Sequence, residues 1–203
     1  MFKSEKSRLV LASGSHTRAT LLEKTGLSFE IDPPHIDEPS IRKVFEAEDT
    51  DPADIAEILA EAKAMDISKS RADQIIIGSD QILALGDEII EKPTNKDEAH
   101  ASLFKLRGKT HKLISAVVIV KNNNVIWRHS DTAELTMRDF SPEFLGEYLA
   151  HSGDTIYKSP GSYQIENFGI HLFEEIKGDY FTILGFPLLP LLGYLRQENL
   201  IRS

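Results

Sequence analysis

The stretch Gln74–Pro93, QIIIGSDQILALGDEIIEKP, determines how the rest of this chain can be arranged. It opens with Ile75–Ile77, a β-branched run typical of a short strand that is buried on both faces. Gly78 and Ser79 then predict a turn of the backbone, which places Asp80 directly after the end of the strand. A carboxylate at the end of a buried strand is costly to desolvate unless it handles a cation, a metal ion or a proton.

A hairpin is predicted to follow this acid. Two short apolar runs within residues 82–90 flank Gly86 and Asp87, which is the pattern of two strands joined by a tight turn. The hairpin would deliver Lys92 near the same end of the sheet as Asp80. An acid and a lysine brought together in this way could handle a metal and a phosphate. The residues leave open the alternative that Asp80 caps a turn and Lys92 is a solvated surface lysine.

The composition is that of a globular protein. Of 203 residues, 41% are hydrophobic and 27% are charged, so the chain can bury a sizeable core as one medium domain or two small lobes. No linker, repeat or low-complexity tract divides it, and we expect a single domain over residues 1–203. The net charge of −9 argues against binding a nucleic-acid polymer, and an anionic substrate would need local cations.

Three features bear on the cellular compartment. The chain has no cysteine, which excludes disulfides, thiolate metal sites and cysteine nucleophiles and fits a reducing compartment. Residues 1–8 are polar and charged and predict no secretory signal. No apolar run is long enough to cross a bilayer, so we expect no membrane partner.

The start of the chain has the pattern of an anion-binding turn. Residues 9–12 predict a strand, Ser13 and Ser15 flank a glycine, and residues 16–25 predict a helix. This order points backbone N–H groups and the positive end of a helix at an anion, and Arg18 adds a fixed charge in the first turn. The alternative is that Ser15 is only an N-cap and Arg18 only a surface residue.

Two further segments supply candidate charged groups. Asp51 and Pro52 begin the clearest helix, and Lys63 lies beside its apolar stripe. Asp37 and Glu38 lie in a proline-rich loop that we expect to be extended. Their carboxylates could help to hold a divalent cation, or they could simply be solvated.

Strand and helix patterns alternate along the chain, which predicts an α/β fold with a mixed sheet. Near the C-terminus, residues 169–176 and 180–184 are predicted to be strands. Several known chemistries are excluded, because the sequence lacks a complete P-loop, a G-x-G-x-x-G, an H-E-x-x-H and a G-x-S-x-G motif. His111 precedes a predicted strand and is expected to be structural rather than catalytic.

Taken together, the motifs resemble the Maf family of nucleoside triphosphate pyrophosphatases, from Leu9 to about Leu195. In chain order they are LASGSHTRATLL (Leu11–Leu22), IDE (Ile36–Glu38), AEAKA (Ala60–Ala64), IIGSDQ (Ile76–Gln81), EKP (Glu91–Pro93), LRGKTH (Leu106–His111), GSYQIENFGI (Gly161–Ile170) and GDYFTILGFPL (Gly178–Leu188). Each motif alone is only moderately specific, whereas their shared order and spacing are specific. This match makes Asp80 the first candidate for the catalytic residue.

The resemblance implies hydrolysis of a nucleoside triphosphate between its α- and β-phosphates, which gives the monophosphate and pyrophosphate. It implies an elongated, inosine-triphosphatase-like α/β fold, in which helices flank a mixed sheet and a central cleft separates two lobes. It also implies a divalent metal cofactor, Mg²⁺ or Mn²⁺, a cytoplasmic location and an ability to form homodimers.

Site residues follow from the same resemblance. Asp80 matches the family's general base, which would activate water for in-line attack on phosphorus. Glu38 and Asp80 match plausible ligands of the metal. The residues that match phosphate-binding positions are Ser13, Ser15, Arg18, Lys63 and Lys92.

Three positions bear on base specificity, namely Thr17, Gln81 and Glu166. The family branch that acts on dTTP and UTP tends to carry Arg, Thr and Gln there, and the branch that acts on 7-methyl-GTP carries Trp, Gln and Glu. Two of the three residues therefore resemble the second branch. A carboxylate at Glu166 can accept from the N1–H and the exocyclic amine of guanine, and a methylated, cationic guanine favours it further. Thr17 cannot stack on that cation as a tryptophan would.

The chain departs from the family pattern at the anion-binding turn and at Arg107. The common S-P-R-R start reads Ser15-His16-Thr17-Arg18 here, and Arg107 replaces the serine of a usual Leu-Ser-Gly. The main prediction is a pyrophosphatase of the 7-methyl-GTP type. The alternatives are a dTTP/UTP pyrophosphatase of the same family, or a nucleotide-binding regulator of septum formation without significant turnover.

Overall fold

The computed structural model describes residues 8–202 of the chain. The expectation that residues 1–8 carry no targeting segment therefore falls, apart from Arg8, outside the described residues. The described chain forms two compact units. Unit 1 contains the residues up to Gln81, then Ile114–Thr132 and the residues from Asp179 onward, and unit 2 contains Ile82–Leu113 and Ala133–Gly178. The expectation of a single domain stays a prediction.

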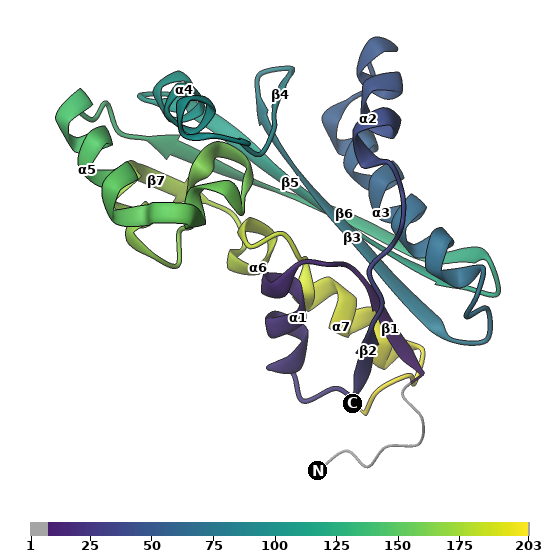
Figure 1. Cartoon of the computed structure of the whole chain (residues 1–203). Coiled ribbons are helices and arrows are strands. Elements are labelled where there is room, and N and C mark those ends of the chain that lie inside the picture. The colour runs from purple at the N-terminus through teal and green to yellow at the C-terminus, as the bar shows by residue number, and fades with distance from the viewer. Residues whose placement is uncertain (1–7, 203) are drawn as a thin grey trace. The chain divides into compact units, whose positions relative to one another are not determined.

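Helices and strands alternate as the sequence indicates (Figure 1). The strands are β1 (Leu9–Ala12), β2 (Phe29–Ile31), β3 (Ile75–Leu85), β4 (Glu88–Ile90), β5 (Thr110–Lys121), β6 (Asn124–Met137) and β7 (Phe173–Lys177). The helices are α1 (His16–Glu23), α2 (Glu38–Ala47), α3 (Pro52–Ser68), α4 (Lys96–Leu106), α5 (Pro142–Ser152), α6 (Tyr180–Ile183) and α7 (Leu188–Gln197). Three short 3₁₀ helices, η1 (Gly153–Tyr157), η2 (Pro160–Ser162) and η3 (Phe168–Leu172), precede β7.

The strands form one mixed sheet, which confirms the predicted fold class. Its order is β2-β1-β3-β5-β6-β7, and β4 pairs with β3. Strand β1 is parallel to β2 and β3, with Leu9 opposite Ile75. The β3–β4 pair is antiparallel, with Leu85 opposite Glu88, so the predicted hairpin is also confirmed.

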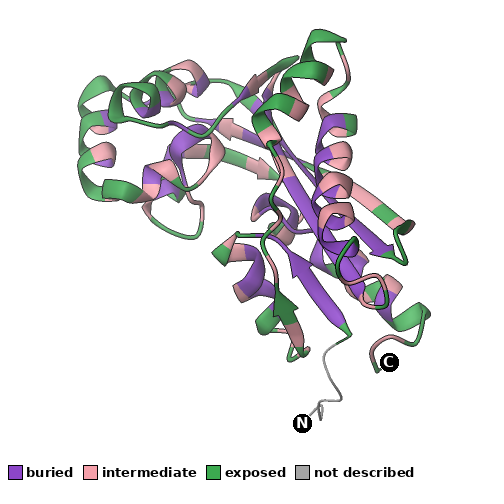
Figure 2. Cartoon of the chain, turned by 45° about the vertical axis from the view of Figure 1, so that its right-hand side comes forward, coloured by how far each residue is buried: buried purple, intermediate pink, exposed green. Residues whose placement is uncertain are grey.

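The core of unit 1 explains why β3 is so apolar. Ile75 and Ile77 of β3 pack with Leu22 of α1 and with Leu191 and Leu195 of α7, and the exposed fraction of each of these side chains is at most 5%. Figure 2 shows β1 and the first part of β3 buried along their length. Alternate residues of a strand point to opposite faces, so this packing leaves the even-numbered residues of β3 facing the other side.

The predicted turn at Gly78 and Ser79 is wrong, because β3 continues through both residues without a break. Gly78 instead lets helix α3 approach the strand. A Cβ atom at this position would lie 2.2 Å from the Ala60 carbonyl oxygen and 2.9 Å from the Ala64 Cβ atom. The glycine and the two alanines therefore bring the backbones of α3 and β3 into contact, and Asp80 lies within the strand rather than after it.

Two other local predictions are corrected. The predicted strand at residues 180–184 is wrong, because Tyr180–Ile183 form helix α6. Asp179 caps this helix by accepting from the Phe181 and Thr182 N–H groups at 2.9 and 3.2 Å. The loop around Asp37 and Glu38 ends in helix α2, which the sequence analysis missed. Asp37 is the N-cap of α2, and its carboxylate accepts from the Ser40 N–H group at 3.2 Å.

The C-terminal prediction of a strand at residues 169–176 is correct only in part. Residues Phe168–Leu172 form a 3₁₀ helix, and β7 begins at Phe173. Within residues 8–202, the helices lack the combination of length and apolar character that would let one cross a membrane.

The close approach of α3 to β3 can be tested with Gly78→Ala. The added methyl group would collide with the Ala60 carbonyl, so we expect the free energy of unfolding to fall by about 3 kcal/mol or more, measured by urea denaturation. Gly146→Ala is the matched control. Gly146 lies within α5, and a Cβ atom there meets nothing within 4 Å, so the same change should stabilise the protein by up to about 1 kcal/mol. Equal effects of the two changes would contradict this account.

Candidate functional site: a buried lysine between two carboxylates

The centre of the candidate site is the ammonium group of Lys63. Its Nζ atom lies 2.6 Å from Oδ1 of Asp80 and 2.8 Å from Oε2 of Glu38. Lys63 and Asp80 are only 5% and 7% exposed, whereas the Glu38 side chain is 44% exposed. The structure therefore brings together three of the residues that the sequence analysis selected, all within unit 1.

Lys63 and Asp80 are each positioned by a local feature of their own element. Asp51 caps the start of α3, and Lys63 follows on the buried stripe of that helix, between Ala60 and Ala64. Asp80 lies two residues after Gly78 and faces the same helix. Removing one partner of a buried ion pair leaves an uncompensated charge in the interior, which typically costs about 3–5 kcal/mol.

The guanidinium group of Arg18 forms a second buried centre. Its Nε atom donates to the Gly185 carbonyl at 2.8 Å, and Nη1 donates to the Ser79 carbonyl at 2.8 Å and to Ser13 Oγ at 3.3 Å. Burial lowers the pKa of Arg18, and the negative charges of Asp80 and Glu38 oppose that shift. The fixed cation that the sequence analysis placed in the anion-binding turn is thus buried beside the carboxylates rather than on the surface.

The turn between β1 and α1, which the sequence predicts to bind an anion, has the predicted strand–turn–helix structure. Ser15 is the N-cap of α1, because its Oγ atom accepts from the Arg18 N–H group at 3.4 Å. Ser13 is buried, and its Oγ atom accepts from the Ser15 N–H group at 3.2 Å. Thr17 lies half-buried in the first turn of α1. The predicted N-cap role of Ser15 and its predicted place beside an anion are compatible, since both use the start of the same helix.

Gln81 lies on the face of β3 that is opposite to Asp80. Its Nε2 atom donates to Ser115 Oγ at 3.1 Å and to the carbonyls of Thr182 and Ile183 at 3.1 and 2.9 Å. Two N–H groups shared among three protein acceptors leave the Oε1 atom as the part of this amide with free capacity for a ligand. Sequence reasoning missed Ser115 and the carbonyls, because backbone acceptors carry no sequence signal.

Two other predicted site residues, Lys92 and Glu166, belong to unit 2. Lys92 is exposed and follows β4. Glu166 is exposed within a turn in which the Asn167 N–H group donates to the Gln164 carbonyl at 3.2 Å. The side chain of Asn167 also donates to Gln164 Oε1, at 3.0 Å, so both backbone and side-chain bonds close the turn that carries Glu166.

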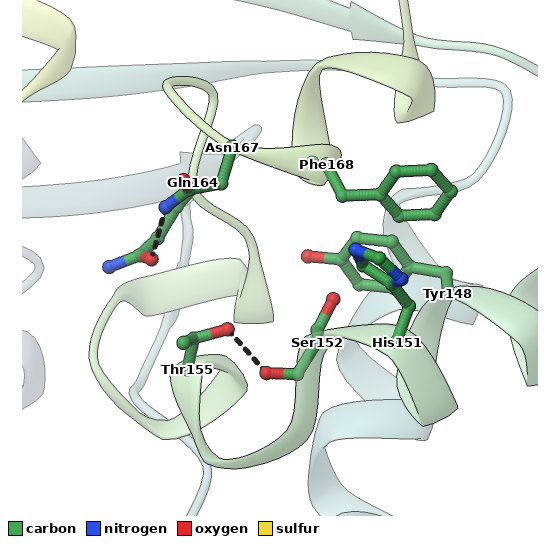
Figure 3. Close-up of a pocket in the computed structure, with 8 residues that line it drawn as sticks. Tyr148, His151, Ser152, Thr155, Gln164, Asn167 and Phe168 are labelled. Atoms are coloured by element: carbon green, nitrogen blue, oxygen red, sulfur yellow. Dashed lines mark hydrogen bonds between the residues drawn. The ribbon is translucent and has the colours of Figure 1, made fainter.

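A cavity of about 230 Å³ lies beside this turn in unit 2 (Figure 3). Phe168 contributes a wall with His151, whose ring centroid is 4.4 Å away, and with Tyr148. The hydrogen-bonded side chains of Gln164 and Asn167 line another part of it (Figure 3). Gln164 before Glu166, and Asn167 and Phe168 after it, therefore have partners within unit 2.

His111, at the start of β5, is the most buried titratable group in this region, with 1% of its surface exposed. Its Nε2 atom lies 2.6 Å from the hydroxyl oxygen of Tyr163, and its ring packs against Tyr163 and Phe173. Burial lowers the pKa of His111 from 6.5 to about 4. The expectation that this histidine is structural agrees with its burial.

The lowered pKa of His111 predicts a pH dependence of stability. The unfolded chain binds a proton more readily than the folded chain between pH 6.5 and about 4. The stabilisation is therefore complete above pH 6.5 and is lost as the pH falls towards 4, by up to about 3 kcal/mol. Urea denaturation at several pH values should show that His111→Gln loses less stability over this window than the wild type. The same loss in both proteins would contradict the prediction.

The carboxylates can be compared with what a divalent metal requires. Within residues 8–202, no group of three or more histidine, cysteine, aspartate or glutamate side chains is arranged to hold a metal ion. Mg²⁺ is commonly held by one or two carboxylates together with substrate phosphates and water. Asp80 and Glu38 each use one oxygen on Lys63, and each has a second carboxylate oxygen. This donor set fits a hard cation held jointly by the protein and a phosphorylated substrate.

The sequence as a whole shows the class of proteins to which this chain belongs. Residues 8–198 match the family described as Maf-like protein, so the chain belongs to the Maf family. A relative from Brucella abortus biovar 1 (strain 9-941), named 7-methyl-GTP pyrophosphatase, is 47% identical over 194 residues, which cover 96% of this chain and 98% of the relative.

Other relatives are similar over nearly their whole length. A protein of Rhizobium meliloti (strain 1021) with the name 7-methyl-GTP pyrophosphatase is 47% identical over 196 residues, which cover 97% of this chain and 98% of the relative. A nucleoside triphosphate pyrophosphatase of Paramagnetospirillum magneticum (strain ATCC 700264 / AMB-1) is 44% identical, with coverages of 94% of this chain and 98% of the relative. Among solved structures, a nucleoside-triphosphatase, dITP/XTP pyrophosphatase, of Mycobacterium abscessus has 13% identity, a TM-score of 0.40 and 95% coverage of both chains, a likeness too distant to support an inference.

Proposed function

We propose that this protein is a nucleoside triphosphate pyrophosphatase of the 7-methyl-GTP type. It hydrolyses the bond between the α- and β-phosphates and releases the nucleoside monophosphate and pyrophosphate. The observation that carries the proposal is the buried Lys63 ammonium between the carboxylates of Asp80 and Glu38, beside the guanidinium of Arg18. The names of relatives that are 44–47% identical over nearly the full length support the same activity.

Asp80 is the proposed general base. Its Oδ1 atom is held by Lys63, and its Oδ2 atom is available to accept a proton from the attacking water. The hydrogen bond from Lys63 fixes the orientation of the carboxylate, so that the base is in place before the nucleotide arrives. The proton leaves the water as its oxygen attacks phosphorus, and pyrophosphate is the leaving group.

The cations stabilise the negative charge of the phosphates. Lys63 has a third N–H group beyond the two that its carboxylates can accept, and that group can donate to a phosphate oxygen. The N–H groups at the start of α1, with Ser13, Ser15 and Arg18 around them, form the second part of the phosphate site. Lys92 of unit 2 is proposed to add a further charge, as its motif implies.

A divalent cation, Mg²⁺ or Mn²⁺, would be held by Glu38 and Asp80 with oxygens of the substrate. When bound, such a cation neutralises phosphate charge and polarises the phosphoryl group. The absence of cysteine from the chain supports a reducing compartment, and we propose a cytoplasmic enzyme that acts on free nucleotides and can form homodimers.

Base preference is proposed to depend on Glu166, with Gln81 and Thr17 as further positions. A carboxylate accepts from the two adjacent donors of guanine, whereas uracil and thymine offer a single ring N–H donor on the same edge. If Gln81 contacts the base, its saturated Nε2 atom restricts that contact to the Oε1 acceptor. Both positions would then favour a base that presents N–H donors.

The function is tested by pyrophosphate release with Mg²⁺ or Mn²⁺ from 7-methyl-GTP, GTP, dTTP, UTP and CTP. We expect the highest kcat/KM with 7-methyl-GTP, because Glu166 favours a guanine that carries a positive charge. A preference for dTTP and UTP would replace this proposal with the second branch of the family. Nucleotide binding by calorimetry without pyrophosphate release would instead support the regulator of septum formation.

The base assignment is tested separately with Asp80→Asn. Loss of a general base typically costs about 10²–10⁴ in rate, so kcat should fall at least about 100-fold while the protein remains folded by circular dichroism. Asp87→Asn is the matched control, since Asp87 is an exposed acid in the turn between β3 and β4. It should retain the wild-type rate. Substantial turnover by Asp80→Asn would remove this residue from the role of base.

A further inference from the structure

We propose that His111 and Tyr163 form a positioning pair that holds the turn carrying Glu166, and that this pair is needed for discrimination between nucleobases. The role in discrimination between nucleobases rests on the proposed function. The role in holding the turn rests only on contacts within unit 2. Neither residue belongs to the group of charges around Asp80. Both are positioning residues, because they act through Glu166.

The first observation is that a histidine occupies a buried site where an apolar side chain would cost less free energy to bury. His111 is 1% exposed and remains neutral near pH 7, because burial lowers its pKa to about 4. Its Nδ1 atom is buried without a hydrogen-bond partner within the described part of the chain. Burying an unpaired polar atom costs free energy that an aliphatic side chain would avoid. What the histidine adds is its 2.6 Å hydrogen bond between Nε2 and the Tyr163 hydroxyl group.

The second observation is that several contacts besides the His111–Tyr163 hydrogen bond fix the loop before Glu166. Gly161 has a φ of +73°, and a Cβ atom there would lie 2.6 Å from Leu83 Cδ1. Ser162 also has a positive φ, of +63°, and its carbonyl accepts from the Tyr148 hydroxyl group at 2.9 Å. The Tyr163 carbonyl accepts from Ser159 Oγ. Residues in this unfavoured backbone region persist only where the surroundings fix them.

The third observation is the continuity between Tyr163 and Glu166. The turn from Gln164 to Asn167 begins directly after Tyr163 and is closed by its backbone and side-chain hydrogen bonds. Gly169 packs against it, since a Cβ atom there would lie 2.5 Å from the Gln164 carbonyl oxygen. A shift of the Tyr163 side chain would therefore be transmitted to the turn as a unit. His111 ties that side chain to β5, a strand of the sheet.

This arrangement explains how an exposed carboxylate can read a base. Two hydrogen bonds from adjacent donors of guanine require the acceptor to be placed within about 0.5 Å. Glu166 is exposed at the tip of its turn, so its placement depends on the backbone that carries it. A looser turn would still offer a negative charge, but it would lose the two-point contact that separates guanine from uracil.

The test uses Tyr163→Phe, His111→Gln and Glu166→Gln in the full-length chain, with Tyr157→Phe as the matched control. Tyr157 lies in η1 of the same unit, so the control removes a tyrosine hydroxyl group without touching the His111 contact. We expect Tyr163→Phe to raise the KM for 7-methyl-GTP about 10-fold with little change in kcat, and to leave the kcat/KM for UTP within about threefold of wild type. His111→Gln, which can keep a polar group near the Nε2 position, should lie between wild type and Tyr163→Phe.

A double-mutant cycle shows whether the pair acts through Glu166. In the Glu166→Gln background, Tyr163→Phe should have no further effect on the ratio of kcat/KM values for 7-methyl-GTP and UTP. Equal losses on every nucleotide, or independent and additive effects of the two changes, would show a merely structural role and overturn the proposal. Tyr157→Phe should behave as wild type.

Amide hydrogen exchange tests the positioning without any activity. We expect Tyr163→Phe to lose protection within residues 159–170 and to retain it in β3 and α3. Unchanged protection of that segment would overturn the positioning role, even if the kinetics changed. A wild-type protein that exchanges as expected but hydrolyses no nucleotide would instead count against the proposed function, so the two failures are distinguishable.

Discussion

The buried ammonium of Lys63, shared by Asp80 and Glu38, is the interaction on which the arrangement of unit 1 depends. A lysine and an aspartate of this burial are tolerated in a protein interior only as partners. Their contact requires helix α3 to lie directly on β3, and Gly78 makes that approach sterically possible. The start of α2 then adds the third charge. The packing of α3 on β3 and the pairing of Lys63 with Asp80 therefore depend on the same close approach of the two elements.

Consecutive residues of strand β3 make contacts on the two opposite faces of the sheet. Gly78 and Asp80 face α3, whereas Ser79 and Gln81 contact the segment from Thr182 to Gly185. That segment ends the four-residue helix α6, and carbonyls at a helix end can accept from groups outside the helix. Side chains of β3, β5 and α1 donate to the carbonyls of Ile183, Thr182 and Gly185, respectively. The polar residues within this apolar strand are thus paired on one side with a cation and on the other with a helix end.

Sequence reasoning predicted the fold class, the β3–β4 hairpin, the cap of α3 and the grouping of Asp80, Lys63 and Glu38. These features depend on periodicity, on capping residues or on motifs that the chain shares with a family. It failed at residues 78–79 and 180–184. A glycine is compatible with a turn or with a strand that a helix approaches closely, and a short apolar run is compatible with a strand or a helix. Only the neighbouring α3 and the cap at Asp179 decide between them. The partners of Gln81 and Arg18 were also out of reach, because most are backbone carbonyls distant in sequence.

The hydrogen bond from Arg18 to the Gly185 carbonyl joins residues 167 positions apart. During synthesis, α1 and most of β3 leave the ribosome long before Gly185 exists, and non-local contacts of this kind form late. Ser79 Oγ donates to the same carbonyl, so Arg18 and Ser79 share one acceptor from the C-terminal segment. A nascent chain can therefore offer Arg18 the Ser13 and Ser79 acceptors but not the Gly185 carbonyl. The hydrogen bonds of Arg18 and Ser79 are therefore completed only when the C-terminal segment folds back onto β3 and α1.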